Sequence, residues 1–218
     1  YLGLPSALHS FFEVAFFISA VWMSGIIGKN SQAANQIALN LASMTYMVAL
    51  GVGVAAMIRV GNQRGMMNFI KLREVALSTL LLIIIVDILF CFIFLIFNDY
   101  LPLLYLDPNN ANNLADVNEV IQIASKLLII AGVFQLFDGI QAVVLGALRG
   151  MQDVNKPALI IFLSYGLIGF PTSYFLGFYT SLSVVGIWIG LMIGLFSSSL
   201  FLFLRFNYLS KKTIRLND

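Results

Sequence analysis

The sequence predicts an all-α integral membrane protein with six transmembrane helices, and its composition and hydropathy pattern both point to this class. Of its 218 residues, 60% are hydrophobic and only 10% are charged, and the mean hydropathy is +0.95. Soluble domains, by comparison, carry about 25% charged residues. The apolar residues are gathered into six runs, each long enough to cross a bilayer as a helix. The single cysteine, Cys91, cannot form an intrachain disulfide and belongs to no metal or redox motif.

We expect residues 1–210 to form one six-helix lobe and residues 211–218 to form a polar tail. The predicted spans cover residues 5–27, 32–58, 73–98, 118–147, 157–179 and 183–207. Polar or turn-forming residues separate the spans, and the longest separating segment includes Asp107–Asn113.

Proline and glycine residues add local detail to three spans. Pro5 stands near the start of the first span, where its missing N–H costs nothing. Gly51 and Gly53 in the second span are predicted to allow close approach of another helix. Pro171 lies inside the fifth span and is predicted to kink it.

The basic residues are distributed unevenly between the two ends of the predicted bundle. If the chain starts in the cytoplasm, ten of the twelve lie on the cytoplasmic side: Arg59, Arg64, Lys71, Arg73, Arg149, Lys156, Arg205, Lys211, Lys212 and Arg215. Lys29 then lies outside, and Lys126 falls within the fourth span. The positive-inside rule therefore predicts that both termini, and with them the tail 211–218, are cytoplasmic.

Three acidic residues lie deep inside predicted spans, where ionisable groups usually face a bundle interior or a wet cavity. Glu13 is eight residues beyond Pro5, which puts it about 12 Å along the helix from the predicted cytoplasmic end. Asp138 is eleven residues before Arg149, which puts it about 16 Å from that same end. We therefore expect the two carboxyl groups to lie at similar depth. Asp87 is about 21 Å beyond Arg73 by the same rise; it could also be a structural residue bonded to a neighbouring helix.

Several neutral polar residues accompany these carboxyl groups. Gln135, Asp138 and Gln141 recur at intervals of three, which puts them on roughly one helix face. His9 is one turn before Glu13 and could hydrogen-bond to it, or could lie near the interface without a role. Asn35 and Gln36 in the second span could support the site, although hydrogen bonding between helices is the commoner role for such residues.

The paired carboxyl groups suggest cation chemistry. Removal from water favours the protonated form of a carboxyl group, so Glu13 and Asp138 could exchange H⁺ near neutral pH. By analogy with other hard cations, they could instead hold Na⁺. An acidic apolar cavity also suits cationic amphiphilic solutes. Competition between such a solute and H⁺ or Na⁺ would give exchange. The nineteen phenylalanines fit such a cavity or packing against lipid equally well.

Long ordered segments resemble the multidrug and toxic compound extrusion (MATE) family, and the match covers nearly the whole chain. They are GLPSALHSFFEV, AANQIALNLASMTYMVALGVGVAAMIRVGNQRG, FQLFDGIQAVVLGALRGMQDVNKP, YGLIGFPTSYFLGF and GIWIGL. The chain resembles the C-terminal lobe, spans seven to twelve, of a twelve-helix antiporter. The resemblance implies export of organic cations or drugs against Na⁺ or H⁺, a partner N-terminal lobe, no other cofactor and no nucleic acid.

The resemblance also assigns residues. Glu13 and Asp138 match the family's acidic residues associated with cation binding. Phe134 stands where some Na⁺-coupled members carry an aromatic hydroxyl, and His9 stands where a Gln is expected. Asp87 matches no motif of the family. The breadth of the family points to a bacterial inner membrane. The first residue is Tyr1 rather than Met, and the residues Leu2–Pro5 that follow lack the basic region of a signal peptide, so we expect a piece of a longer chain.

Two other functions are weaker interpretations of the sequence. A lipid-linked oligosaccharide flippase of the same superfamily would use cationic cavities, whereas these spans carry carboxyl groups and essentially one base, Lys126. An intramembrane enzyme would need a GxGD pair, an HExxH helix or a Ser–His pair, but the chain has one His and no HExxH. A receptor or structural membrane protein would not require ionisable groups at matched depth.

Overall fold

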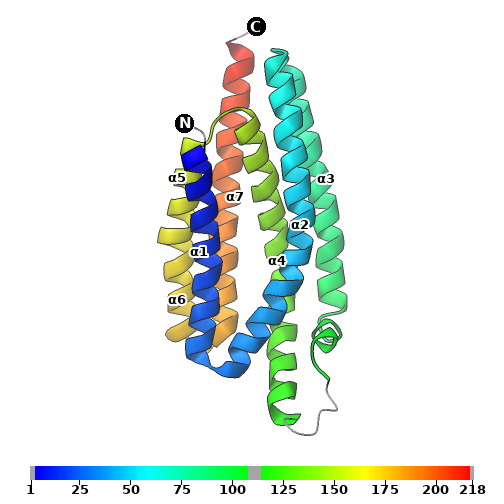
Figure 1. Cartoon of the computed structure of the whole chain (residues 1–218), viewed down its shortest axis with the longest axis vertical. Coiled ribbons are helices and arrows are strands. Elements are labelled where there is room, and N and C mark those ends of the chain that lie inside the picture. Colours follow the sequence, from blue (N-terminus) through cyan, green and yellow to red (C-terminus); the bar gives the residue numbers. More distant parts are fainter. Residues whose placement is uncertain (1–2, 108–113, 217–218) are drawn as a thin grey trace.

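A computed structural model describes residues 3–107 and 114–216, without the side chains of residues 3–6, and it confirms the all-α prediction. Within these described ranges, six helices are long and apolar enough to cross a membrane (Figure 1). The elements are α1 (Gly3–Ile27), α2 (Lys29–Gly65), α3 (Phe69–Ile96), a 3₁₀ turn (Leu101–Leu104), α4 (Leu114–Gly150), α5 (Asn155–Leu163), a π-helical turn (Ser164–Gly169), α6 (Phe170–Phe178) and α7 (Ser183–Arg215). The fifth span consists of α5, the π turn and α6.

The helices extend beyond the apolar segments that predict them, because a helix does not need to end where the bilayer ends. α2 runs to Gly65 and α4 begins at Leu114. α7 continues to Arg215, so the polar segment that starts at Lys211 is helical up to that residue. Residues 108–113 of the predicted loop and residues 217–218 of the tail lie outside the described residues.

α4 is the central helix of the lobe and packs against α2, α3 and α7 (Figure 1). Small residues allow this packing: a Cβ on Gly53 of α2 would lie 2.8 Å from the carbonyl oxygen of Ala142, and a Cβ on Gly146 would collide with the backbone of Gly53. The close approach predicted at Gly53 is therefore confirmed. The prediction for Gly51 is wrong, because a Cβ there would meet nothing within 4 Å.

The fifth span contains a π turn, Ser164–Gly169, that ends two residues before Pro171, and the kink predicted at Pro171 stays a prediction. Proline has no N–H to continue the helical hydrogen-bond ladder, and sharp helix kinks occur both at proline and at π bulges. Tyr165 in this turn stacks on Phe16 of α1, with ring centroids 4.4 Å apart. The irregular segment is thereby packed against the first helix.

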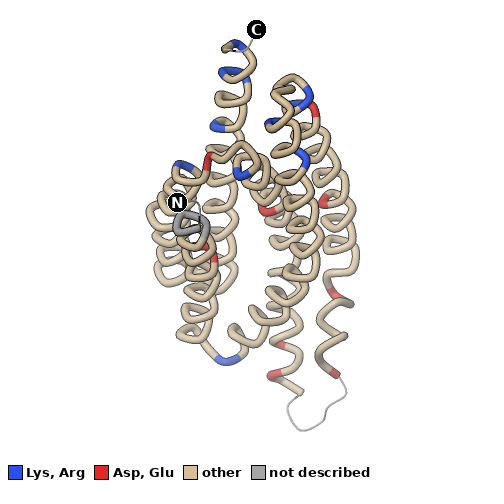
Figure 2. The backbone as a smooth tube through the Cα atoms, turned by 45° about the horizontal axis from the view of Figure 1, so that its top comes forward, with Lys and Arg blue, Asp and Glu red and all other residues tan. Residues whose placement is uncertain are grey.

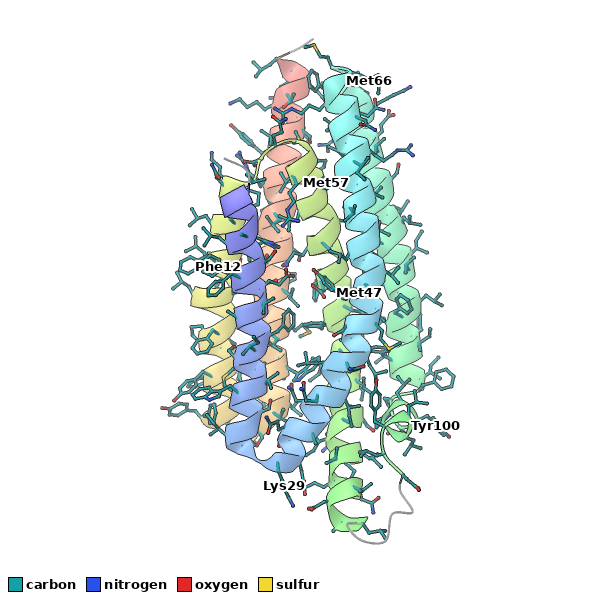
Figure 3. The ribbon with its side chains drawn as sticks, in the orientation of Figure 1. Phe12, Lys29, Met47, Met57, Met66 and Tyr100 are labelled. Atoms are coloured by element: carbon teal, nitrogen blue, oxygen red, sulfur yellow. The ribbon has the colours of Figure 1, made fainter. Side chains whose placement is uncertain are left out.

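The basic residues are concentrated toward the end of the lobe at which the C-terminus lies (Figure 2). At this end Arg73 of α3 donates hydrogen bonds to Asn207 and Ser210 of α7, at 2.7 and 2.6 Å. Arg205 of α7 forms an ion pair with Asp153, at 2.8 Å. The opposite end carries the α1–α2 turn with Lys29 (Figure 3). The lobe therefore has the two-ended charge distribution that the sequence predicts.

Candidate functional site

Glu13 and Asp138 line the same cavity, of about 310 Å³, between α1, α2 and α4. The sequence predicts similar depth for the two carboxyl groups, and the fold places both on the wall of one space. The rest of the lining is mostly apolar: Val14, Phe17, Ile18, Leu39, Ala42, Ser43, Tyr46 and Phe134. A mostly apolar cavity with a few convergent polar groups is typical of small-molecule sites.

Tyr46 of α2 is a member of this site that the sequence analysis missed. Its hydroxyl donates a hydrogen bond to Oε1 of Glu13, at 3.3 Å. The residues are 33 positions apart, so no local spacing could reveal their contact. The available signal was a phenolic hydroxyl in the middle of an apolar span, where a polar atom normally needs a partner.

His9 lies beside Glu13, as predicted, and is also held by Arg149. Its Nε2 is 3.8 Å from Oε2 of Glu13, which is too long for a hydrogen bond. Its Nδ1 is 3.0 Å from Nη2 of Arg149. A guanidinium group can only donate, so Nδ1 accepts and the ring is a neutral tautomer whose proton is on Nε2. The contact joins the end of α4 to α1, a role for Arg149 that the sequence analysis missed.

Asp138 is almost completely enclosed, with 5% of its surface exposed. Its Oδ1 accepts no hydrogen bond from any described residue. An ionised carboxylate that is buried without donors is strongly unfavourable, whereas a proton or a bound cation removes that penalty. The surroundings of Asp138 therefore favour a protonated or cation-bound carboxyl group over a bare carboxylate.

The polar face predicted along α4 is divided among different neighbours. Gln141 exchanges two hydrogen bonds with the hydroxyl of Tyr165, at 2.6 and 2.9 Å, and so ties α4 to the π turn. Gln135 is buried, and its amide atoms bond to no described residue. Phe134 lines the cavity and packs against Trp188. Of the three polar residues on this face, only Asp138 lines the cavity with Glu13.

The remaining candidates lie outside the cavity. Asn35 accepts a hydrogen bond from Nε1 of Trp188, at 2.9 Å, which confirms a packing role between α2 and α7. Gln36 is exposed and does not line the cavity. Asp87 of α3 is 1% exposed and lies against Gly139 of α4, where an added Cβ would collide with its Oδ2. Asp87 therefore occupies the α3–α4 interface.

The site offers oxygen ligands but no cluster typical of a structural metal. Among the described residues, no group of three or more His, Cys, Asp or Glu side chains could hold a metal ion. The cavity instead provides two carboxyl groups and the hydroxyl of Tyr46. These groups could bind protons or a hard monovalent cation, and the apolar lining could contact an organic solute.

Comparison with known proteins identifies the family. The family model named MatE matches residues 5–175, which is more than half of the chain. The chain belongs to the MatE family. It is 38% identical over 216 residues to "Probable multidrug resistance protein NorM" of Agrobacterium fabrum, covering 98% of this chain and 45% of that protein. It is 33% identical over 215 residues to "Multidrug resistance protein MdtK" of Yersinia enterocolitica, covering 97% and 45%. The MatE chain thus spans about half the length of these curated relatives.

Solved structures share the fold of this MatE chain. The "Crystal structure of MATE in complex with MaL6" has a TM-score of 0.86 at 18% identity, and the match covers 98% of this chain and 46% of that one. The "Crystal structure of eukaryotic MATE transporter AtDTX14" has a TM-score of 0.82 at 23% identity, covering 97% and 47%. The resemblance predicted from the sequence is confirmed, including its extent of one half-length lobe.

Proposed function

We propose that this chain forms one lobe of a transporter that exports organic cations in exchange for H⁺ or Na⁺. The observation that carries the proposal is the shared cavity, in which Glu13 and Asp138 converge within a mostly apolar lining. The relatives named as multidrug resistance proteins support drug-like substrates. Carboxyl groups in the cavity favour a cationic solute over the anionic lipid phosphate of a flippase.

The exchange follows from competition for the two carboxyl groups. A cationic solute gains most when Asp138 and Glu13 are ionised and free, whereas H⁺ or Na⁺ at these groups removes the charge that attracts it. Each ligand shifts the conformational equilibrium of the lobe only by its difference in affinity for the two states. In this proposal Tyr46 orients Glu13 and supplies the hydroxyl oxygen that Phe134 lacks.

The proposal includes a second lobe and an orientation in the membrane. The chain spans about half of its relatives' length, and a single lobe does not surround a central pathway, so alternating access requires two bundles that rock against each other. The positive-inside rule places the basic end, and with it both termini, on the cytoplasmic side. The bacterial relatives support the inner membrane as the location.

Gradient-driven efflux tests this function. The chain is reconstituted in liposomes together with the N-terminal lobe of the same transporter, which gives a two-lobe system. Efflux of a fluorescent organic cation is then recorded under an imposed H⁺ or Na⁺ gradient. We expect one gradient to drive efflux and Asp138→Asn to abolish it. Asp99→Asn, at an exposed position beyond the end of α3, is the matched control and should transport like wild type. Failure of both gradients to drive efflux would contradict the proposed substrate class and coupling.

A further inference from the structure

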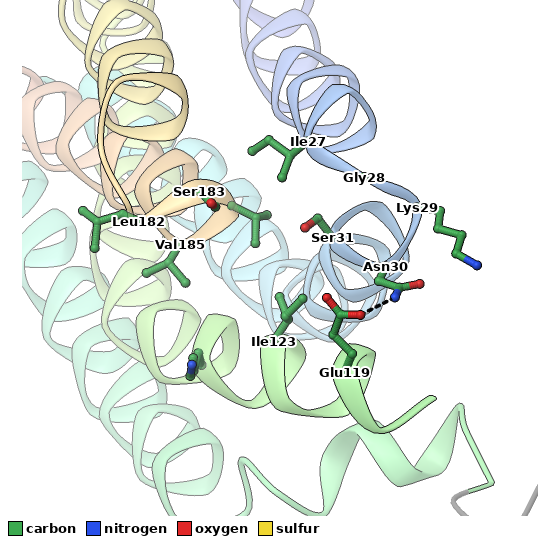
Figure 4. Close-up of a pocket in the computed structure, with 12 residues that line it drawn as sticks. Ile27, Gly28, Lys29, Asn30, Ser31, Glu119, Ile123, Leu182, Ser183 and Val185 are labelled. Carbon is green, nitrogen blue, oxygen red and sulfur yellow. Dashed lines mark hydrogen bonds between the residues drawn. The ribbon is translucent and has the colours of Figure 1, made fainter. Parts of the chain in front are cut away.

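A second cavity, of about 460 Å³, is lined by Lys29, which lies at the end of the lobe opposite the C-terminus (Figure 3). It is lined by the α1–α2 turn at Gly28, by Glu119, Ile123 and Lys126 of α4, and by the start of α7 (Figure 4). It shares no lining residue with the cavity around Glu13 and Asp138. The candidate transport site therefore does not account for this cavity.

One lysine on the wall of this cavity has no side-chain partner among the described residues. Lys126 of α4 is exposed and forms no ion pair or side-chain hydrogen bond with any described residue. Lys29, which also lines the cavity, differs in this respect because its Nζ is 2.7 Å from Oδ2 of Asp116. Lys126 is thus the cation that remains available to a ligand.

The nearby acidic groups already have donors. Glu119 lines the cavity and accepts a hydrogen bond from Nδ2 of Asn30, at 2.6 Å (Figure 4). Asp116 accepts from Lys29 and from Asn30, at 2.7 and 3.2 Å. Asp116 is therefore ion-paired with Lys29, whereas Glu119 keeps its negative charge because the amide of Asn30 is neutral; neither carboxylate forms an ion pair with Lys126.

Two further sets of donors face the same space. α7 starts in the cavity wall at Ser183 and Val184, and no side chain caps it. The first amides of a helix usually lack intrahelical acceptors and attract anions. Here the amide of Val185 already donates to the carbonyl oxygen of Leu182, at 3.1 Å, so the amides left for a ligand are those of Ser183 and Val184. Ser31 of α2 is 8% exposed, and its hydroxyl has no hydrogen-bond partner among the described residues. Figure 4 shows this hydroxyl pointing into the space between α2 and the start of α7.

We propose that this cavity binds the phosphate group of a phospholipid headgroup. The ammonium of Lys126, the amides at the start of α7 and the hydroxyl of Ser31 supply donors from three helices for phosphate oxygens. A lipid is favoured over a soluble anion because the cavity lies where membrane-spanning helices end, and because Ile27, Ile123 and Leu182 add apolar surface to its wall. The proposal does not rest on the transport function.

Lipid binding to the purified full chain tests the proposal. The chain is delipidated in detergent and titrated with a short-chain phosphatidylglycerol, and bound lipid is counted by native mass spectrometry. We expect Lys126→Gln to weaken binding on the order of tenfold, as for the loss of one charge-assisted hydrogen bond. Lys71→Gln removes an exposed lysine at the basic end and should bind like wild type. Ser31→Ala should weaken binding by a smaller factor.

Competition distinguishes the possible sources of phosphate. If inorganic phosphate at equal concentration leaves the lipid bound, the headgroup assignment is supported. If inorganic phosphate binds as tightly and displaces the lipid, the phosphate chemistry is supported and the lipid assignment is overturned. Equal lipid binding by wild type and Lys126→Gln, with both chains folded by circular dichroism, would overturn the site altogether.

Discussion

The hydroxyl of Tyr46 donates a hydrogen bond to Oε1 of Glu13 across 3.3 Å and so joins α2 to α1 at the wall of the cavity that Glu13 and Asp138 line. The two helices meet at the Gly28 turn and diverge from it (Figure 1). This bond is therefore a direct link between them. It also fixes one oxygen of Glu13 relative to the cavity.

Tyr46→Phe removes this link without changing the ring. We expect the affinity for the coupling cation to fall by a factor of about 2–10, because a neutral hydrogen bond contributes roughly 0.5–1.5 kcal/mol. The affinity is read from the cation dependence of efflux in the two-lobe system. Tyr100→Phe changes an exposed tyrosine and serves as the control. Equal cation dependence in wild type and Tyr46→Phe would contradict a role for the hydroxyl.

His9→Ala should destabilise the lobe by about 1–3 kcal/mol, because it leaves the guanidinium of Arg149 without the acceptor at 3.0 Å. His9→Gln keeps an acceptor on the same face of α1, so it should recover much of the loss. Thermal unfolding in detergent measures both variants. If His9→Gln destabilises the lobe as much as His9→Ala, the hydrogen bond from Arg149 to residue 9 does not stabilise the lobe.

Gly139→Ala should destabilise the α3–α4 interface by about 1–3 kcal/mol, because its Cβ would overlap Oδ2 of Asp87. The cost should shrink when Asp87 is also changed to Ala, and a double-mutant cycle measures this coupling. Gly51→Ala is the matched control, because its Cβ meets nothing within 4 Å. Additive effects of Gly139→Ala and Asp87→Ala would show that the two residues do not oppose each other.

Tyr165→Phe should cost about 1–3 kcal/mol, because it leaves the buried amide of Gln141 without its partner. Gln141→Leu combined with Tyr165→Phe should be less damaging than the sum of the single changes, since both partners are then apolar. Chemical unfolding of the four chains measures the interaction energy. A zero interaction energy would mean that the pair does not tie α4 to the π turn.

The helical class and the two carboxyl groups were predictable because both depend on the cost of placing polar groups in a membrane. Six apolar runs need six helices, and a carboxyl group at the depth of Glu13 or Asp138 needs a special environment. The helix ends were less predictable, because polar residues such as Lys211 continue a helix outside the bilayer as readily as they end it.

The partners of the site residues could not be read from the sequence, because they depend on which helix faces lie together. Tyr46 reaches Glu13, and Arg149 reaches His9, only through the packing of α1 against α2 and α4. The spacing of Gln135, Asp138 and Gln141 suggests one shared environment, yet Gln141 is bonded to Tyr165 while Asp138 lines the cavity. A face shared on one helix does not specify a shared neighbour.

Competition between a cation and an organic solute at Asp138 is the central claim, and ligand displacement tests it most directly. A fluorescent organic cation is bound to the reconstituted two-lobe protein, and its anisotropy is followed while H⁺ or Na⁺ is added. We predict that one of these ions releases the dye from wild type, and that Asp138→Asn binds the dye weakly and shows no ion-dependent release. If Asp138→Asn binds and releases the dye like wild type, cation exchange at Asp138 is contradicted.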